Sequence, residues 1–281
     1  MDNTSRKRKN YNFKIGCVIT AAMLLFVLVG IIWTPYPPEA VDASAKLAGS
    51  SLAHPFGCDQ LGRDILSRVM SGSKITLFAA AGTVLLGGSI GVLIGAFTGY
   101  FGSVLDEVLM RIMDVMFAFP SILLSLVVIA VLGPGNYQTV LALGIAFVPS
   151  FARIVRSEFI RCREMEYVKL ARLSGACDLR IMFVHILPNI RQVLLSSLMI
   201  GFNNAVLAEA SLSYLGIGVQ PPYASLGRML SEAQSYIFVS PGSCIWPGLV
   251  LILMILGFSL MSDGMSVEMH ERKRWKRKNV C

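Results

Sequence analysis

Few side chains in this 281-residue chain have the types and spacing that catalysis requires. Its three histidines form no His-Glu-x-x-His zinc motif, and neither a Gly-x-Ser-x-Gly nucleophile motif nor a Gly-x-x-x-x-Gly-Lys-[Ser/Thr] nucleotide loop is present. The cysteines, at positions 17, 58, 162, 177, 244 and 281, include no Cys-x-x-Cys pair of the kind typical of zinc sites. We therefore expect no catalytic residue, no metal site and no cofactor bound by this chain itself.

A carboxylate within an apolar stretch is the clearest polar group left to consider. Glu209 follows Asn203 and Asn204 in a segment that is otherwise largely apolar. A charge in mid-bilayer costs roughly 2.5–3.5 kcal/mol on insertion scales, so such a group needs a function or a partner. One interpretation is that the three residues line a water-filled route or a seam between subunits. The alternative is a structural carboxylate near the outer headgroups, hydrogen-bonded to a neighbouring helix.

The composition indicates that a bilayer surrounds most of the chain. Hydrophobic residues make up 54%, charged residues only 15%, and the mean hydropathy is +0.64. We predict an all-α integral membrane protein with six transmembrane helices, at about 15–33, 75–100, 112–132, 139–154, 193–212 and 245–260. The fourth is the weakest, because Pro149 and Ser150 interrupt it and Arg153 and Arg156 crowd its end. Pro120 is expected to kink the third, and Asp114 is interpreted as structural, at its inner interface.

The positive charges predict the orientation. With the amino terminus inside, 20 of the 25 Lys and Arg residues lie on the cytosolic side. Both termini are then cytosolic, as a basic segment 1–14 and a basic tail 263–281, and 34–74 is an external loop with an amphipathic segment. The basic termini are expected to contact anionic membrane lipid rather than nucleic acid. A signal-peptide cleavage at the Ala-Ser-Ala of 43–45 is a weaker alternative, because it lies far from the apolar run.

This topology places two cysteines, Cys58 and Cys244, on the oxidising face. Free thiols are the simple interpretation for all six cysteines, and a disulfide between these two is the alternative. His54 with Cys58 provides only two metal ligands, which is too few for a site.

A stripe of small residues runs along the second predicted span. Gly87, Gly91, Gly95 and Gly99 recur every fourth residue, in register with Ala79 and Thr83. Such a stripe lets another helix approach backbone to backbone. We interpret it as packing within the chain, with a second membrane subunit as the alternative partner.

A polar segment, 164–188, separates the fourth and fifth predicted spans. Residues 164–174 suit a helix that Gly175 ends in a left-handed conformation, Asp178 suits the cap of a second short helix, and Pro188 suits the end of that helix. A pair of short helices held between two spans is a surface that another protein can bind.

Four blocks of sequence resemble one family. They are His54-Pro-Phe-Gly-Cys-Asp-Gln-Leu-Gly-Arg-Asp-Ile-Leu-Ser-Arg68, Arg111-Ile-Met-Asp-Val-Met-Phe-Ala-Phe-Pro120, residues 166–188, and Leu212-Ser-Tyr-Leu-Gly-Ile-Gly-Val-Gln-Pro-Pro222 followed by Trp246-Pro-Gly and Leu256-Gly-Phe. The chain resembles the permease subunits of ATP-binding-cassette importers for dipeptides, oligopeptides and nickel, the second permease of each pair. The resemblance implies the type I importer permease fold, with a five-helix transmembrane domain over 75–262 and a cytosolic coupling helix between spans four and five.

The resemblance also implies the partners. They are a second homologous permease, two cytosolic ATPase subunits that hold ATP and Mg, and an extracellular or periplasmic substrate-binding protein. The residues implied to contact the ATPases belong to the 164–188 segment: Glu166, Lys169, Ala171, Arg172, Gly175, Asp178, His185 and Pro188.

Several positions depart from the family's pattern. Lys169 and Leu170 replace the Glu-Ala that begins the coupling motif, whereas Ala171 and Gly175 fit it. Lys169 places a positive charge at the position where the family's pattern has a carboxylate, so an ATPase contact made by that carboxylate is not expected here. The neighbouring Glu166 is a candidate to make the contact instead. Cys58, Leu226 and the basic tail after Met269 are further differences.

The cargo stays open between peptides, which we favour, and nickel. The predicted loop 34–74 is too short for a folded receptor domain, so selection is expected to fall to the binding protein. A self-contained secondary transporter or channel is the alternative of a different class. It should show inverted repeats and several intramembrane charges, and neither is evident.

Overall fold

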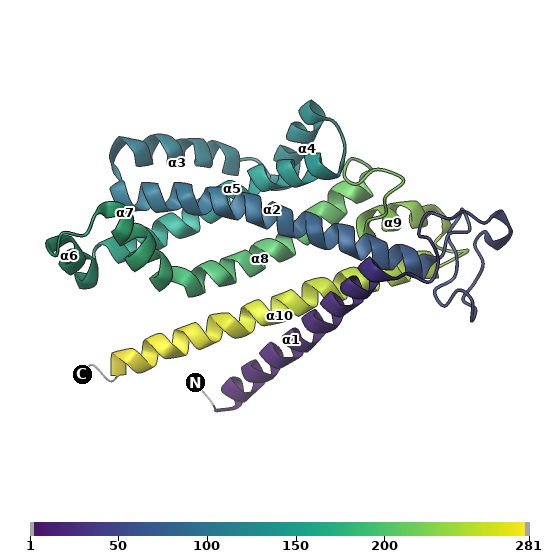
Figure 1. Ribbon diagram of the computed structural model, residues 1–281, viewed down its shortest axis with the longest axis horizontal. Helices are drawn as coiled ribbons and strands as arrows, with labels where there is room; N and C mark the ends of the chain where they lie inside the picture. The colour runs from purple at the N-terminus through teal and green to yellow at the C-terminus, as the bar shows by residue number, and fades with distance from the viewer. Residues whose placement is uncertain (1–2, 279–281) are drawn as a thin grey trace.

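The architecture is a bundle of long helices (Figure 1). The structure is a computed structural model that describes residues 3–278 and, within them, the side chains of residues 11–264. The helices are α1 (Asn3–Ile32), α2 (Ile65–Phe101), α3 (Ser103–Phe117), α4 (Ser121–Leu132), α5 (Asn136–Arg163), α6 (Glu166–Leu173), α7 (Asp178–Arg180), α8 (Leu187–Tyr214), α9 (Leu226–Ala233) and α10 (Gly242–Lys278). Short turns lie at Ala43–Ala45, Ile181–Ile186 and Gln234–Tyr236.

The described residues contain six candidate spans when one bent pair of helices is counted as one. Among these residues, five helical segments are long and apolar enough to cross a membrane singly: Tyr11–Ile32, Ile65–Phe101, Asn136–Arg163, Asp178–Tyr214 and Gly242–Gly264. The sixth is α3 with α4, which meet at 93°. Pro120 is the N-cap of α4, and its ring has no N–H to continue the ladder from α3. The expected kink at Pro120 is therefore confirmed, as a full break.

The fourth predicted span extends well beyond its predicted end. The sequence placed it at 139–154, but α5 runs without interruption from Asn136 to Arg163 and contains Pro149. Neighbouring helices surround this part of α5, since Val148, Phe151 and Ala152 are buried. Packing of this kind lets a membrane helix tolerate a proline.

The glycine stripe packs against α5 within the same chain. A Cβ atom at Gly87 would lie 2.6 Å from the Gly144 carbonyl oxygen, and one at Gly95 would lie 2.5 Å from the Ala152 carbonyl oxygen. Gly91 meets Phe151 and Ala152 of α5 in the same way, and Gly99 meets Arg156 and Phe159. The intrachain interpretation of the stripe is confirmed.

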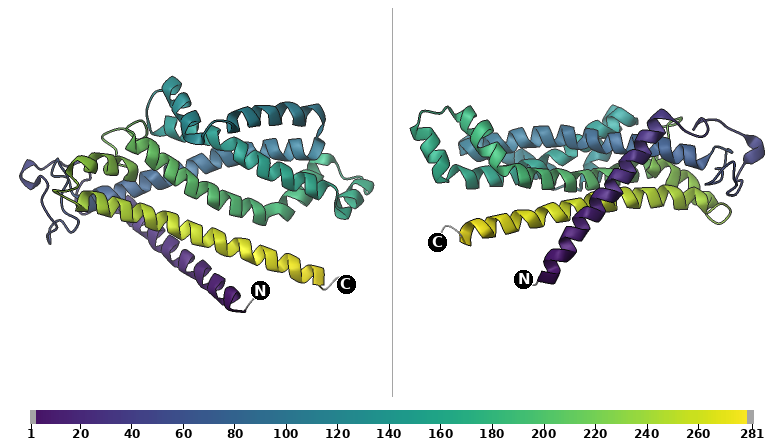
Figure 2. Two further views of the ribbon diagram at one scale, coloured as in Figure 1. Left: turned by 180° about the vertical axis from the view of Figure 1, so that it is seen from behind. Right: turned by 60° about the horizontal axis from the view of Figure 1, so that its bottom comes forward.

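The first and last helices pack together along the edge of the bundle (Figure 2). Glycines again mark the contact: a Cβ at Gly16 would lie 2.7 Å from the Met261 nitrogen, and one at Gly257 the same distance from the Thr20 hydroxyl. The free ends of α1 and α10 point toward the end of the molecule that carries α6 (Figure 1). The side chains of the basic clusters at 6–9 and 272–278 lie outside the described residues.

The opposite end carries α9 and the loop before α2 (Figure 1). This loop was expected over 34–74, but α2 already begins at Ile65, where the Asp64 carboxylate accepts a hydrogen bond from the Ser67 N–H. An N-cap of this kind explains the early start. Similarly, helix α10 continues through the predicted tail to Lys278.

An ion cluster joins this loop to α2 and α9. It consists of Asp59, Arg63, Arg68, Arg228 and Glu232. The Glu232 carboxylate lies 3.0 Å from Arg63 and 3.1 Å from both Arg68 and Arg228, while Arg63 and Arg68 also pair with Asp59. Burial raises the pKa of Glu232, but Arg68 and the other two guanidinium groups outweigh this and leave the pKa below its usual 4.5.

We predict that replacing Gly95 by Ala destabilises the bundle by about 1–3 kcal/mol, the usual cost of overpacking. The matched control is Gly248→Ala in α10, where the nearest atom to an added Cβ is 3.8 Å away. Thermal unfolding in detergent should show a lower melting temperature for Gly95→Ala alone. Equal melting temperatures for both variants would contradict the described packing of α2 on α5.

We also predict a pH-dependent contribution from Glu232. A carboxylate whose pKa is lowered by folding stabilises the protein above its unfolded pKa, and this contribution disappears as the pH falls through the folded value. The stability advantage of the wild type over Glu232→Gln should therefore be full at pH 7 and should shrink below a pH of about 4.5. Glu39→Gln, which changes an exposed carboxylate, is the control. A pH-independent difference for Glu232→Gln would refute the prediction.

Candidate functional site

Helix α6 has one buried and one exposed face. Val168 is 1% exposed and packs in an apolar cluster with Phe159, Ile181 and Met182. On the other face Leu170 and Leu173 are 66% and 85% exposed. An apolar pair held outward by a buried anchor is the arrangement of a protein-binding helix.

The exposed face of α6 also carries two unpaired charges. Neither Glu166 nor Lys169 forms an ion pair with a residue that the structure describes, and both side chains are exposed. Ala171 is half-buried and packs on the same cluster as Val168. Glu166 and Lys169 are therefore free to contact a partner, whereas Ala171 helps to fix the helix in place.

Gly175 ends α6 in the predicted left-handed conformation, with φ of +80°. Its N–H donates to the Arg172 carbonyl at 3.1 Å, and the Ala176 N–H donates to the Ala171 carbonyl at 3.1 Å. These two bonds form a Schellman motif, which satisfies carbonyls left open at a helix end. Nothing lies within 4 Å of an added Cβ, so the requirement for glycine is conformational and not one of space.

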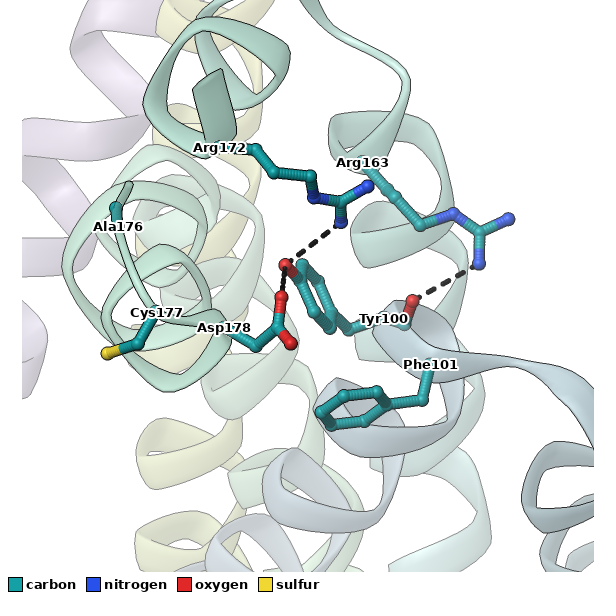
Figure 3. A pocket seen from close by; sticks show the side chains of 7 residues that line it. All are labelled: Tyr100, Phe101, Arg163, Arg172, Ala176, Cys177 and Asp178. Atoms are coloured by element: carbon teal, nitrogen blue, oxygen red, sulfur yellow. Dashed lines mark hydrogen bonds between the residues drawn. The ribbon is translucent and has the colours of Figure 1, made fainter. Parts of the chain in front are cut away.

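Tyr100, at the end of α2, connects four elements (Figure 3). Its hydroxyl donates to the Asp178 carboxylate of α7 at 2.5 Å and accepts from the Arg172 guanidinium of α6 at 3.1 Å. Its backbone carbonyl accepts from Arg163 of α5 at 3.2 Å. We call this set, Tyr100 with Arg163, Arg172 and Asp178, the Tyr100 junction.

Two sequence predictions for the 164–188 segment need correction. Asp178 does not cap its own helix: Cys177 occupies the N-cap position, and the Asp178 carboxylate turns to Tyr100 instead. Pro188 does not end the second short helix either, because the helical segment Asp178–Tyr214 continues through it. A π turn at Ile181–Ile186, in which the Leu187 N–H bonds to the Met182 carbonyl, precedes the proline. This wider turn accommodates a residue that lacks an N–H.

A second link joins α6 to α8. The Asn189 amide donates to the Tyr167 hydroxyl at 3.0 Å. His185 is half-buried within the π turn. Together with the Tyr100 junction, this contact holds α6 between α2 and α8.

The structure does not bring the three predicted pathway residues together. The Asn203 amide faces α10, within 3.3 Å of the Ile255 carbonyl and 3.2 Å of the Ser259 nitrogen once its oxygen and nitrogen are assigned by these contacts. Asn204 is exposed and lines a groove of about 250 Å³ between α4, α5 and α8. Glu209 is fully buried and accepts from the Ser213 hydroxyl at 2.7 Å. This burial favours the structural alternative for Glu209, but the hydroxyl that donates to it belongs to the same helix and not to a neighbouring one.

The cysteines and His54 have ordinary surroundings. Cys58 and Cys244 are both free thiols, as are Cys17, Cys162 and Cys177. The His54 imidazole nitrogen lies 3.0 Å from the Asp64 carboxylate, so its partner is that residue and not Cys58.

Comparison with known proteins agrees with this architecture. The family described as "binding-protein-dependent transport system inner membrane component" matches residues 91–274. The chain belongs to this family. It is 36% identical over 262 residues to the dipeptide transport system permease protein DppC of Alkalihalophilus pseudofirmus, covering 92% of this chain and 85% of the relative. It is 38% identical over 253 residues to the glutathione transport system permease protein GsiD of Pectobacterium atrosepticum, covering 88% and 84%.

The family resemblance drawn from the four sequence blocks is thus confirmed, and so is the all-helical, multi-pass membrane fold. The region that the family matches includes the glycine stripe from Gly91 onward, the Tyr100 junction and the whole 164–188 segment. Sequence reasoning missed Tyr100. The one signal for it was its place directly after Gly99, at the end of the stripe.

We predict that Tyr100→Phe loosens the 164–188 segment without unfolding the bundle. The change removes the hydroxyl that bonds to two charged groups, and such bonds contribute about 1.5–3 kcal/mol each. Amide hydrogen exchange over residues 166–180 should speed up by at least about tenfold, the factor that the loss of a single such bond represents. Tyr137→Phe, which alters a side chain that is 84% exposed, is the control. Unchanged exchange in Tyr100→Phe would show that the junction does not hold α6.

Proposed function

We propose that this chain is a permease subunit of an ATP-binding-cassette importer for dipeptides or oligopeptides, and that α6 is the helix on which a cytosolic ATPase subunit binds. The observation that carries the proposal is the two-faced geometry of α6. Val168 anchors one face in the membrane domain, and Leu170 and Leu173 stand exposed on the other. The exposed apolar pair, flanked by the free charges of Glu166 and Lys169, suits a groove on a soluble partner.

The proposed mechanism is rigid displacement of helices. A movement of α6 reaches α2 through the hydrogen bonds of Tyr100 and reaches α8 through Asn189. The segment Asp178–Tyr214 is helical without a break, although it bends between α7 and α8 (Figure 1), so it connects the proposed ATPase surface to the membrane-crossing part of α8. Alternating access by rocking of packed helices needs connections of this kind.

The remaining parts of the importer are proposed as separate proteins. Two ATPase subunits hold ATP and Mg, a second homologous permease completes the membrane pathway, and an external binding protein delivers the cargo. Both termini and α6 are proposed to be cytosolic. The distribution of Lys and Arg supports this orientation, as does the position of the chain ends toward the α6 end of the bundle.

Peptides are the proposed cargo. Two similar proteins, at 36% and 38% identity, are named for dipeptide and glutathione transport, and glutathione is itself a tripeptide. These names favour peptides over nickel. Membership of a family described as binding-protein-dependent also favours the importer over a self-contained secondary transporter or channel.

The proposal is tested by Gly175→Val compared with Gly175→Asn. A β-branched side chain in the left-handed region is strained by about 1–2 kcal/mol, whereas Asn tolerates that region. We expect Gly175→Val to co-purify with several-fold less ATPase and to transport less peptide, while Gly175→Asn stays close to the wild type. If Gly175→Val binds the ATPases and transports peptide normally, α6 is not the binding element.

A further inference from the structure

Glu209, in the last turns of α8, has an unusual set of partners. Its carboxylate is fully buried, and no Lys, Arg or His of the described residues pairs with it. Besides the bond from Ser213, the hydroxyls of Thr76 on α2 and of Ser225, the N-cap of α9, interact with the carboxylate. No hydrogen bond of regular geometry from a described residue reaches Oε2. Glu209 therefore joins three elements through hydroxyl groups and not through an opposite charge.

Each of the three hydroxyls also accepts a backbone N–H. The donors are Val219 to Ser213 at 3.1 Å, Leu226 to Thr76 at 3.3 Å and Arg228 to Ser225 at 3.3 Å. A hydroxyl that accepts an N–H still has its own proton to donate to the carboxylate. Through these hydroxyls Glu209 orients the backbone from the loop after α8 to the first turn of α9.

Glycines bring the backbones of these elements close together around Glu209. A Cβ atom at Gly227 of α9 would lie 2.2 Å from the carbonyl oxygen of Ala210, the residue that follows Glu209. One at Gly72 of α2 would lie 3.3 Å from the Ser225 carbonyl carbon. An apolar side chain at position 209 would keep this packing without the cost of burying a carboxylate. The carboxylate is therefore expected to provide something that packing does not.

Hydrogen bonds fix a position that apolar packing leaves free. Apolar contacts have no preferred direction, so packed surfaces can slide, whereas a hydrogen bond weakens steeply outside a narrow range of distance and angle. Helix α9 is tied a second time, because Glu232 pairs with Arg63 and Arg68 in the ion cluster. Helix α9 thus forms one unit with the loop before α2 and with the ends of α2 and α8.

The same two helices, α2 and α8, hold α6 at the opposite end of the bundle (Figure 1). There the links are the Tyr100 junction and the bond between Asn189 and Tyr167. A displacement of α6 can therefore reach α9 along two helices. The Glu209 contacts are the last step of both routes, since they join α9 to α2 through Thr76 and to α8 through Glu209 itself.

We propose that Glu209 is a positioning residue that makes α9 follow α2 and α8, so that the outer end of the importer moves together with α6. This inference rests on the proposed function, in which α6 binds an ATPase subunit. With the Glu209 contacts in place, α9 and the loop before α2 are carried along by the two helices. Without them, α2 and α8 shift past α9 while α9 stays in place, and ATP hydrolysis no longer moves peptide.

The test uses the whole importer in proteoliposomes, with the second permease, the ATPases and the binding protein. Thr76→Val keeps the shape of the side chain and removes the hydroxyl between α9 and Glu209. It should lower the number of Ala-Ala-Ala molecules transported per ATP hydrolysed by about fivefold, the factor that one neutral hydrogen bond represents. Glu209→Leu removes all three contacts and should lower this ratio further. Glu209→Gln keeps an oxygen that accepts from a hydroxyl, so its ratio should lie between those of Glu209→Leu and the wild type.

Thr83→Val is the matched control. Thr83 lies two turns further along α2 and is equally buried, and its hydroxyl has no hydrogen-bond partner among the described residues. This variant should keep the wild-type ratio of peptide to ATP. If Thr76→Val behaves like Thr83→Val, Glu209 only stabilises the fold and the inference is wrong. A parallel fall of transport and ATP hydrolysis at a constant ratio would show lost assembly and not lost coupling, and would equally overturn it.

A second measurement follows α9 directly. Amide hydrogen exchange over residues 225–233 is compared between the nucleotide-free importer and the importer trapped with ATP and vanadate. The wild type should show a difference in α9, and Glu209→Leu should lose it while keeping the difference in α6, at 166–173. A wild-type response of α9 in Glu209→Leu would contradict the inference.

The same experiment separates this inference from the proposed function. If nucleotide changes exchange in α6 of the wild type but not in α9, only the role of Glu209 is refuted. If nucleotide changes exchange in neither helix, α6 is not the ATPase-binding element, and both proposals fail.

Discussion

The close approach of α2 and α5 is the constraint on which the other contacts depend. Within a bilayer there is no hydrophobic effect to press helices together, so their association relies on packing and polar contacts. Gly87, Gly91, Gly95 and Gly99 remove side chains from one side of α2 and let the backbone of α5 take their place. This contact brings the end of α2 next to the end of α5, where the 164–188 segment begins.

The Tyr100 junction exists only because of that approach. Tyr100 directly follows the last glycine of the stripe, and the α5 residue Arg163 bonds to its carbonyl. The hydroxyl then joins α6 and α7 to the same helix end through Arg172 and Asp178. The 164–188 segment, which connects α5 to α8 along the chain, is in this way also hydrogen-bonded to α2. We proposed that this surface transmits force from an ATPase. The attachment to α2 suits that role, because it holds α6 in a fixed position and does not leave it as a loop that can swing.

Sequence reasoning succeeded where the signal was periodic or local. The small residues at every fourth position predicted helix packing, and Gly175 predicted a left-handed helix end, because each depends on the residue itself and its near neighbours. It failed where a distant partner decides the outcome. Asp178 resembles an N-cap in sequence, but its carboxylate accepts a hydrogen bond from the hydroxyl of Tyr100, 78 residues earlier in the chain. Pro188 resembles a helix end, yet the helix continues through it, because the π turn that precedes it accommodates a residue without an N–H. Glu209 and Asn204 lie in one apolar run, and only the rotation of α8 shows that one is buried and the other lines a groove.

We propose above all that the 164–188 segment is a cytosolic surface covered by an ATPase subunit. Cys177 tests it directly, since this native thiol is exposed beside the Tyr100 junction. Membrane-impermeant maleimide is applied to inside-out and right-side-out vesicles, with and without the ATPase subunits, and modification of Cys177 is followed by mass spectrometry. We expect modification of Cys177 only in inside-out vesicles, and slower modification when the ATPase subunits are bound. Modification of Cys177 in sealed right-side-out vesicles would place the segment outside the cell, where no ATPase could bind it.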